Sequence, residues 1–186
     1  CVAVLGKGHD EVQAILPEHF AHVIQAERKG TGHAVLMAKE YIRSGGFEDV
    51  AVLYGDAPFV LSEDIERAYE QHKAQNNAVT VFSARLEDPA GYGRIVRGTN
   101  GVRAIVEHKD ADEEILQIDE VNAGAYWFNA SFLLEFLEEM TASNAQGEYY
   151  LTDSVEAAVS KGWRVDAYTA SPDTVLGAND RKTLSY

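Results

Sequence analysis

The stretch V-A-V-L-Y-G-D-A-P, residues 50–58, decides how the rest of the chain is interpreted. Its four leading apolar residues predict a buried strand over 50–53, and the turn residues that follow end that strand at once. Asp56 is then expected just beyond the carboxyl end of a strand, where open α/β sheets bind their ligands. A carboxylate held there, with Pro58 after it, suits Mg²⁺ as a hard oxygen ligand, although an Asp at this place can also simply cap a turn.

Segments with the character of strands and helices alternate on both sides of this stretch. The apolar runs that predict strands in the first half are Val2–Leu5, Phe20–Ile24, Val50–Leu53 and Val79–Ala84. The segments whose periodicity or end residues predict helices are His9–Leu16, a single helix from His33 to Gly45, and a helix with Ser62 as its N-cap. This alternating order is typical of an α/β fold in which helices cover a mostly parallel central sheet.

The pattern changes in the second half of the chain. Short apolar runs at 95–96, 102–106 and 121–128 lie close together, with turns at Gly98 and Gly101. Such spacing predicts hairpins, and so a smaller mixed β region beside the central sheet. The elements expected after it are a helix with an apolar stripe from Phe132 to Met140, a helix that begins with the capping box of Asp153 and Glu156, and a strand over Trp163–Tyr168.

The composition describes a globular domain that carries strong negative charge. With 186 residues, of which 46% are apolar and 25% charged, the chain is long enough for one domain with a sizeable core. Its 16 basic and 30 acidic residues give a net charge of −14, which argues against a general nucleic-acid binder and against attachment to anionic lipid. The apolar runs are strand-sized, so no membrane span is predicted. The single cysteine excludes an internal disulfide and fits a reducing compartment.

A second candidate site is Q-A-E-R-K-G-T-G-H-A, residues 25–34. A threonine stands between two glycines immediately before a predicted helix. Glycine permits a close approach of the backbone, and a helix N-terminus presents free N–H groups. Such a loop can hold a planar base or an anion, and it can equally be a plain turn. By contrast, the turn at Gly6–Gly8 completes neither of the common phosphate-binding motifs.

Three further segments carry groups that can recognise a sugar through backbone N–H, carboxylate and amide. They are G-Y-G-R-I at 91–95, E-H-K-D at 107–110 and N-A-G at 122–124. Taken singly, each is also compatible with a turn or a solvated face. Asp110 and Asp112 match the D-x-D with which many glycosyltransferases bind a metal, but they lie in an acidic stretch that favours a solvated loop. The sequence has no motif that indicates a nucleophilic side chain.

Six motifs together carry a resemblance to a known family. They are Q-A-E-x-x-G-T-G-H-A at 25–34, Y-G-D-x-P at 54–58, G-Y-G-R-I at 91–95, E-H-K-D-A at 107–111, N-x-G at 122–124 and N-A-Q-G-E-Y-Y-L-T-D at 144–153. In this order and spacing the chain resembles the uridyltransferase domain of the bacterial bifunctional N-acetylglucosamine-1-phosphate uridyltransferase/glucosamine-1-phosphate N-acetyltransferase family. The resemblance covers essentially all of residues 1–186. It implies a Rossmann-like nucleotidyltransferase domain of the α/β class.

The resemblance implies a reaction and a role for each matching residue. The family transfers a uridylyl group from UTP to N-acetylglucosamine-1-phosphate, with Mg²⁺, and forms UDP-N-acetylglucosamine and pyrophosphate for peptidoglycan and lipopolysaccharide precursors. The residues implied to bind these partners are Gln25, Gly30 and Thr31 for the uracil, Tyr54 and Gly55 for the shape of the cleft, Asp56 and Asn179 for Mg²⁺ and catalysis, and Gly93, Glu107 and Asn122 for the N-acetylglucosamine.

The chain also departs from the family pattern in two places. No segment matches the family's first strand and its Gly-rich phosphate loop, and no hexapeptide repeats indicate the left-handed β-helix that carries acetyl transfer. The resemblance implies a cytoplasmic enzyme that forms homotrimers through that β-helix. A domain that lacks its phosphate loop is expected to be inactive alone. Another sugar-1-phosphate nucleotidyltransferase, or a non-catalytic nucleotide-sugar-binding fragment, therefore remains an alternative.

Overall fold

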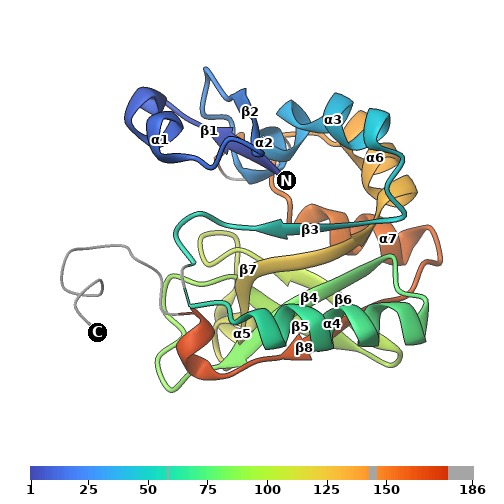
Figure 1. The fold of residues 1–186 in the computed structure, drawn as a ribbon. Helices are drawn as coiled ribbons and strands as arrows, with labels where there is room; N and C mark the ends of the chain where they lie inside the picture. Colours follow the sequence, from blue (N-terminus) through green and yellow to red (C-terminus); the bar gives the residue numbers. More distant parts are fainter. Residues whose placement is uncertain (58, 143–145, 176–186) are drawn as a thin grey trace.

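The computed structural model describes residues 1–57, 59–142 and 146–175 (Figure 1). The strands are β1 (Val2–Leu5), β2 (Ala21–Ile24), β3 (Asp49–Leu53), β4 (Val79–Arg85), β5 (Arg94–Gly98), β6 (Gly101–Val106), β7 (Glu120–Asn129) and β8 (Val165–Thr169). The helices are α1 (His9–Ile15), α2 (Thr31–Met37), α3 (Lys39–Gly45), α4 (Ser62–Gln75), α5 (Glu113–Leu116), α6 (Ala130–Glu139), α7 (Asp153–Ser160) and the 3₁₀ turn η1 (Pro172–Val175). The α/β class is confirmed.

The main sheet is built around β7, the longest described strand. β4 lies along one edge of β7, with Val79 opposite Phe128 and Arg85 opposite Glu120. The other edge is shared: β3 pairs with the C-terminal half of β7 as far as Leu53 opposite Ala125, and β5 joins at Val121. Residues 122–124 of β7 therefore lie at the fork where β3 ends and β5 begins.

Strand directions make this sheet mixed. Its order is β6-β5-β7-β4-β8, with β3 on β7, so the predicted central sheet and the predicted smaller β region form one six-stranded sheet. β3, β4, β5 and β8 share a direction, as a mostly parallel sheet requires, but β7 runs against its three neighbours. Among the strand pairs described for this sheet, β4 and β8 are therefore the pair that runs parallel. β7 runs antiparallel to β5 and therefore parallel to β6, the strand that precedes it in the chain, and the connection between β6 and β7 over residues 107–119 contains α5.

A separate two-stranded parallel sheet, β1–β2, lies beyond β3 in Figure 1. In the described residues β1 and β3 are not paired with each other, and an apolar groove of about 590 Å³ runs between them. Val2, Val4, Val50 and Val52 line this groove, together with apolar residues of α1, α2 and α3. Each strand thus turns one edge, with its backbone hydrogen-bonding groups, toward an apolar space.

Helices cover both faces of the main sheet, as the alternation of side chains along its strands requires. On β4, Val81 packs in the larger core with Phe132 of α6 and Val155 of α7. The next residue, Phe82, points to the other face and packs in a smaller core with Ala68 of α4. Over the described residues, no helix has the length and apolar character to cross a membrane.

Three local predictions are wrong. The single helix expected from His33 to Gly45 is two helices, α2 and α3, which meet at Ala38, where φ is −88° and ψ is 0°. Ser62 is the first residue of α4 instead of its N-cap, a place taken by Leu61. Asp153 does not open a capping box, because the residue at the N-cap is Thr152, whose hydroxyl is bonded to Glu107 instead.

Candidate functional site

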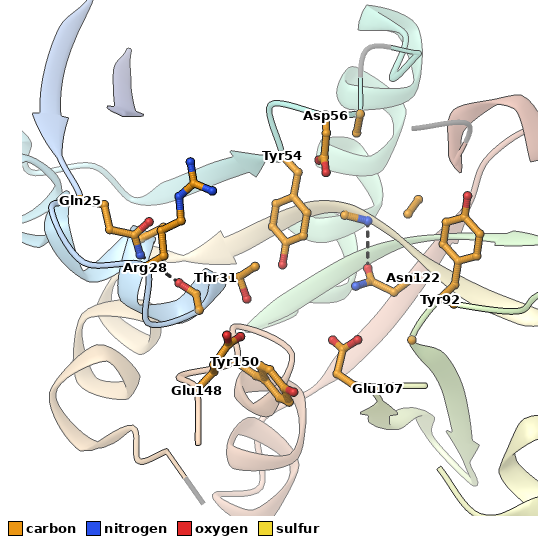
Figure 2. Close-up of a pocket in the computed structure, with 17 residues that line it drawn as sticks. Gln25, Arg28, Thr31, Tyr54, Asp56, Tyr92, Glu107, Asn122, Glu148 and Tyr150 are labelled. Carbon is orange, nitrogen blue, oxygen red and sulfur yellow. Dashed lines mark hydrogen bonds between the residues drawn. The ribbon is translucent and has the colours of Figure 1, made fainter. Parts of the chain in front are cut away.

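A cavity of about 520 Å³ opens at the fork between β3 and β5. Its lining, drawn in Figure 2, comes from segments far apart in the chain. The predicted site residues that line it are Gln25, Gly30, Thr31, Tyr54, Asp56, Gly93, Glu107 and Asn122. Gly55 is not part of the lining, although it lies between two residues that are. Asn179 falls outside the described residues.

The loop before α2 is bonded to the segment at 149–151. The amide of Tyr149 donates to the carbonyl of Lys29 at 2.8 Å, and the amide of Gly32 donates to the carbonyl of Tyr149, also at 2.8 Å. Gly30 has φ +103°, and a Cβ added there would lie 2.5 Å from the Tyr149 oxygen. Only glycine fits this contact, so the loop predicted from sequence depends on a partner more than 100 residues away.

Thr31 begins a chain of hydroxyl groups that crosses the cavity. Its Oγ1 accepts a hydrogen bond of 3.0 Å from the amide of Leu151, and its hydroxyl also interacts with that of Tyr54. Tyr54 in turn lies next to Tyr126, with 5.9 Å between the two ring centroids, and the two hydroxyl groups interact. Burial raises the pKa of Tyr54 to about 12 and raises the pKa of Tyr126 well above its usual value, so both remain protonated at neutral pH.

Asn122 ends this chain with its amide held in one orientation. Its Nδ2 donates to the Tyr126 hydroxyl at 2.6 Å, and its Oδ1 accepts from the amide of Gly124 at 3.1 Å. Since a backbone amide can only donate, the second contact settles which end of the side chain is oxygen. Gly124 has φ +71°, and a Cβ there would lie 2.7 Å from the Tyr54 ring. Gly124 therefore contacts both side chains, because its amide bonds Asn122 and its Cα packs against the Tyr54 ring.

Glu107 lies across the cavity from Gln25 in an acidic environment (Figure 2). The Thr152 hydroxyl donates to its Oε1 at 3.0 Å. Burial raises the pKa of Glu107, while the hydrogen bond from Thr152 opposes the rise and the charge of Asp110 adds to it. Burial also raises the pKa of Asp153 to about 6, with a further contribution from Glu107. Of these three carboxyl groups Glu107 lines the cavity, and its oxygens can accept hydrogen bonds from hydroxyl groups.

Sequence reasoning missed four polar residues of the lining, namely Arg28, Tyr92, Glu148 and Tyr150. Each lies inside a quoted motif, but nothing in the pattern separates it from a solvated neighbour. Arg28 is the one cation among the described lining residues, and Figure 2 shows it beside Gln25. In a chain of net charge −14 it supplies local positive charge for an anion.

The sequence offered two candidate metal sites, Asp56 and the D-x-D of Asp110 and Asp112, and the structure distinguishes them. The Asp56 carboxylate is exposed, lines the cavity, and has no ion-pair partner within the described ranges, so its chemistry fits a hard cation. No group of three acidic, histidine or cysteine side chains suited to a metal occurs in the part of the chain that the structure describes. The D-x-D is not such a site, because Asp112 caps α5 by accepting from the amide of Ile115 at 2.8 Å.

This combination defines an α/β domain with a polar ligand cleft at the carboxyl ends of β2, β3 and β6, the class to which nucleotide-binding proteins belong. The chain belongs to the nucleotidyl transferase family, whose model matches residues 11–172. It is 43% identical over 187 residues to the bifunctional protein GlmU of Acetivibrio thermocellus and 45% identical over 187 residues to that of Halalkalibacterium halodurans. These matches cover 99% of the chain but 40% and 41% of the relatives' length.

Two solved structures share the fold. A candidate glucose-1-phosphate thymidylyltransferase from Bacillus anthracis, in complex with sucrose, superposes with a TM-score of 0.76 at 19% identity, over 99% of this chain and 72% of that one. A UDP-glucose pyrophosphorylase in complex with UDP-glucose superposes with a TM-score of 0.70 at 19% identity, over 90% of this chain and 71% of that one. At such identity the likeness concerns the architecture alone.

Proposed function

We propose that this domain transfers a uridylyl group from UTP to N-acetylglucosamine-1-phosphate, forming UDP-N-acetylglucosamine and pyrophosphate. The observation that carries the proposal is that one cavity brings together the loop at 25–31, Asp56, Glu107 and Asn122. Relatives that share more than 40% of the residues are named bifunctional GlmU proteins, which supports the same reaction.

The two ends of the cavity suit the two parts of the product. Gln25, Gly30 and Thr31 form one end, where an amide, backbone groups and a hydroxyl can read the edge of a base. Glu107 and Asn122 form the other end, where a carboxyl and an oriented amide can bind the hydroxyl and acetamido groups of the sugar (Figure 2). Tyr54 and Asp56 lie between them, where the phosphates that join base and sugar would be held.

The chemistry needs position and charge neutralisation more than a protein nucleophile. The sugar phosphate oxygen attacks the α-phosphorus of UTP in line, the bond to the β-phosphate breaks, and pyrophosphate leaves. Asp56, and Asn179 by resemblance, would hold Mg²⁺, which supplies positive charge to the reacting phosphates. Arg28 contributes positive charge from the base side of the cavity.

Asp56→Asn tests this proposal in the complete gene product. We expect pyrophosphate release from UTP and N-acetylglucosamine-1-phosphate to fall by about 100-fold or more at saturating Mg²⁺, because an amide replaces the anionic ligand at the reacting phosphates. Asp10→Asn is the matched control, since the Asp10 side chain is 94% exposed and lies outside the cavity. Wild-type turnover by Asp56→Asn would refute the metal role.

The same assay separates the alternatives. Faster release with another sugar-1-phosphate would assign a different sugar, and nucleotide-sugar binding without release would assign a binding fragment. We further propose, for the whole protein only, a phosphate loop ahead of β1, a β-helix acetyltransferase domain with homotrimer formation through it, and a cytoplasmic location. These rest on the resemblance and on the chain spanning about 40% of its relatives' length.

A further inference from the structure

The side-chain amide of Gln25 lines the cavity and is held by two acceptors. Its Nε2 lies 3.1 Å from the carbonyl oxygen of Gly30 and 3.0 Å from Nδ1 of His33. A carbonyl oxygen can only accept, so the contact with Gly30 identifies the bonded end of the amide as nitrogen. In Figure 2 the dashed bond runs from this nitrogen, and the Gln25 oxygen points away from it.

These contacts indicate which ring nitrogen of His33 accepts a hydrogen bond. An amide nitrogen carries two hydrogens and accepts none. One hydrogen goes to Gly30, so the other meets Nδ1 of His33, which must present a lone pair and leave the ring proton on Nε2. The ring of His33 lies against that of Tyr149, with 6.1 Å between centroids. Tyr149 also packs against Gly30, so one segment positions both acceptors.

We propose that His33 is a positioning residue that orients Gln25 for base selection, an inference that rests on the proposed function. With both amide hydrogens engaged, Oε1 of Gln25 is left to meet a ligand, and it has no hydrogen-bond partner in the described structure. An oxygen that only accepts favours a base edge that presents an N–H, such as N3–H of uracil. It disfavours an edge with a bare ring nitrogen, such as N3 of cytosine, because two acceptors would then face each other.

The tautomer of His33 can be measured without any nucleotide. Nitrogen-15 spectra of the histidine rings at neutral pH are expected to show His33 with its proton on Nε2 and with Nδ1 unprotonated. A proton on Nδ1 would overturn the inference, whatever the protein binds, because that nitrogen could not accept from Gln25.

Base selection is tested with three variants of the complete gene product. His33→Phe keeps a ring but removes the acceptor, and His33→Asn offers an oxygen close to the position of Nδ1. His22→Phe is the matched control, since His22 is exposed on β2. The measurement is the ratio of the affinities for UTP and CTP by calorimetry. We expect His33→Phe to lower the UTP/CTP ratio by about 5- to 10-fold, in proportion to one buried hydrogen bond. We expect His33→Asn to restore the ratio and His22→Phe to leave it unchanged.

The outcomes separate this inference from the proposed function. If the wild type prefers UTP and His33→Phe keeps that preference, the positioning role of His33 alone is overturned. The same conclusion follows if His33→Asn loses the preference for UTP as fully as His33→Phe does. Wild-type protein that binds neither nucleotide would overturn the proposed function and the base-selecting role together. Should His33→Phe not fold, His33→Asn and the ring spectra decide the question.

Discussion

Replacing Gly30 by alanine is expected to open the loop at 25–31, which forms the proposed base-binding end of the cavity. Gly30 has φ +103° and ψ 174°, a backbone region that is essentially restricted to glycine. The added Cβ would lie 2.5 Å from the Tyr149 carbonyl oxygen and 2.9 Å from the Tyr149 nitrogen. Both atoms take part in the hydrogen bonds that fasten the loop to residue 149, and backbone atoms cannot move aside as a flexible side chain can.

The size of the effect follows from these contacts. The unfavourable backbone conformation costs about 1–3 kcal/mol, and loss of two backbone hydrogen bonds adds about 1 kcal/mol each. If the loop unfolds with the domain, a total of about 3–5 kcal/mol lowers the melting temperature by roughly 6–20 °C in a protein of this size. If the loop detaches by itself, the melting temperature changes less and the affinity for UTP falls instead.

Thermal unfolding and UTP calorimetry should therefore be measured on the same variant. Gly46→Ala is the matched control, because Gly46 also has a positive φ, +62°, but a Cβ there would meet nothing within 4 Å. The control is expected to lose about 1–2 kcal/mol of stability and no affinity for UTP. If Gly30→Ala behaved like Gly46→Ala in both measurements, the reasoning from the Tyr149 contact would be refuted.

Other predictions concern the sugar end, pH and the open groove. Glu107→Gln should raise the KM for N-acetylglucosamine-1-phosphate more than the KM for UTP in steady-state kinetics, and equal rises would contradict a role in sugar binding. Asp153 has its pKa raised from 3.8 to about 6, so the native state binds this proton more tightly than the unfolded state, and the resulting stability is lost as pH rises through that interval. Asp153→Asn should therefore be more stable than wild type at pH 7, by less than about 1 kcal/mol because the carboxylate is only partly desolvated and solvent screens the effect. The difference should vanish near pH 4, and a difference that does not change with pH would contradict the raised pKa. Residues 1–186 made alone should sediment as aggregates and release no pyrophosphate, because the groove between β1 and β3 exposes strand edges and apolar side chains. A soluble, active preparation would show that no added strand is needed there.

Local patterns predicted most elements because they depend on residues close in sequence. The run at 50–53 and the turn after it are β3 and the approach to Asp56, as expected. The prediction fails where a distant partner decides. The hydroxyl of Thr152, at the N-cap of α7, donates to Glu107, 45 residues away, instead of capping the helix, and β7 makes the sheet mixed because it runs antiparallel to the three strands that pair with it.

The candidate site shows the same division. Sequence alone determined the chemical inventory: a Gly-Thr-Gly loop before a helix, a carboxylate after a strand, and polar groups at Glu107 and Asn122. Only the tertiary structure decided that these groups share one cavity and which of their atoms are free. The loop needs Tyr149 to hold it, and Gln25 needs His33 and Gly30 to orient its amide. The direction of these hydrogen bonds and the closeness of these contacts depend on atoms that meet only after folding. A local pattern of residues along the chain therefore does not reveal them.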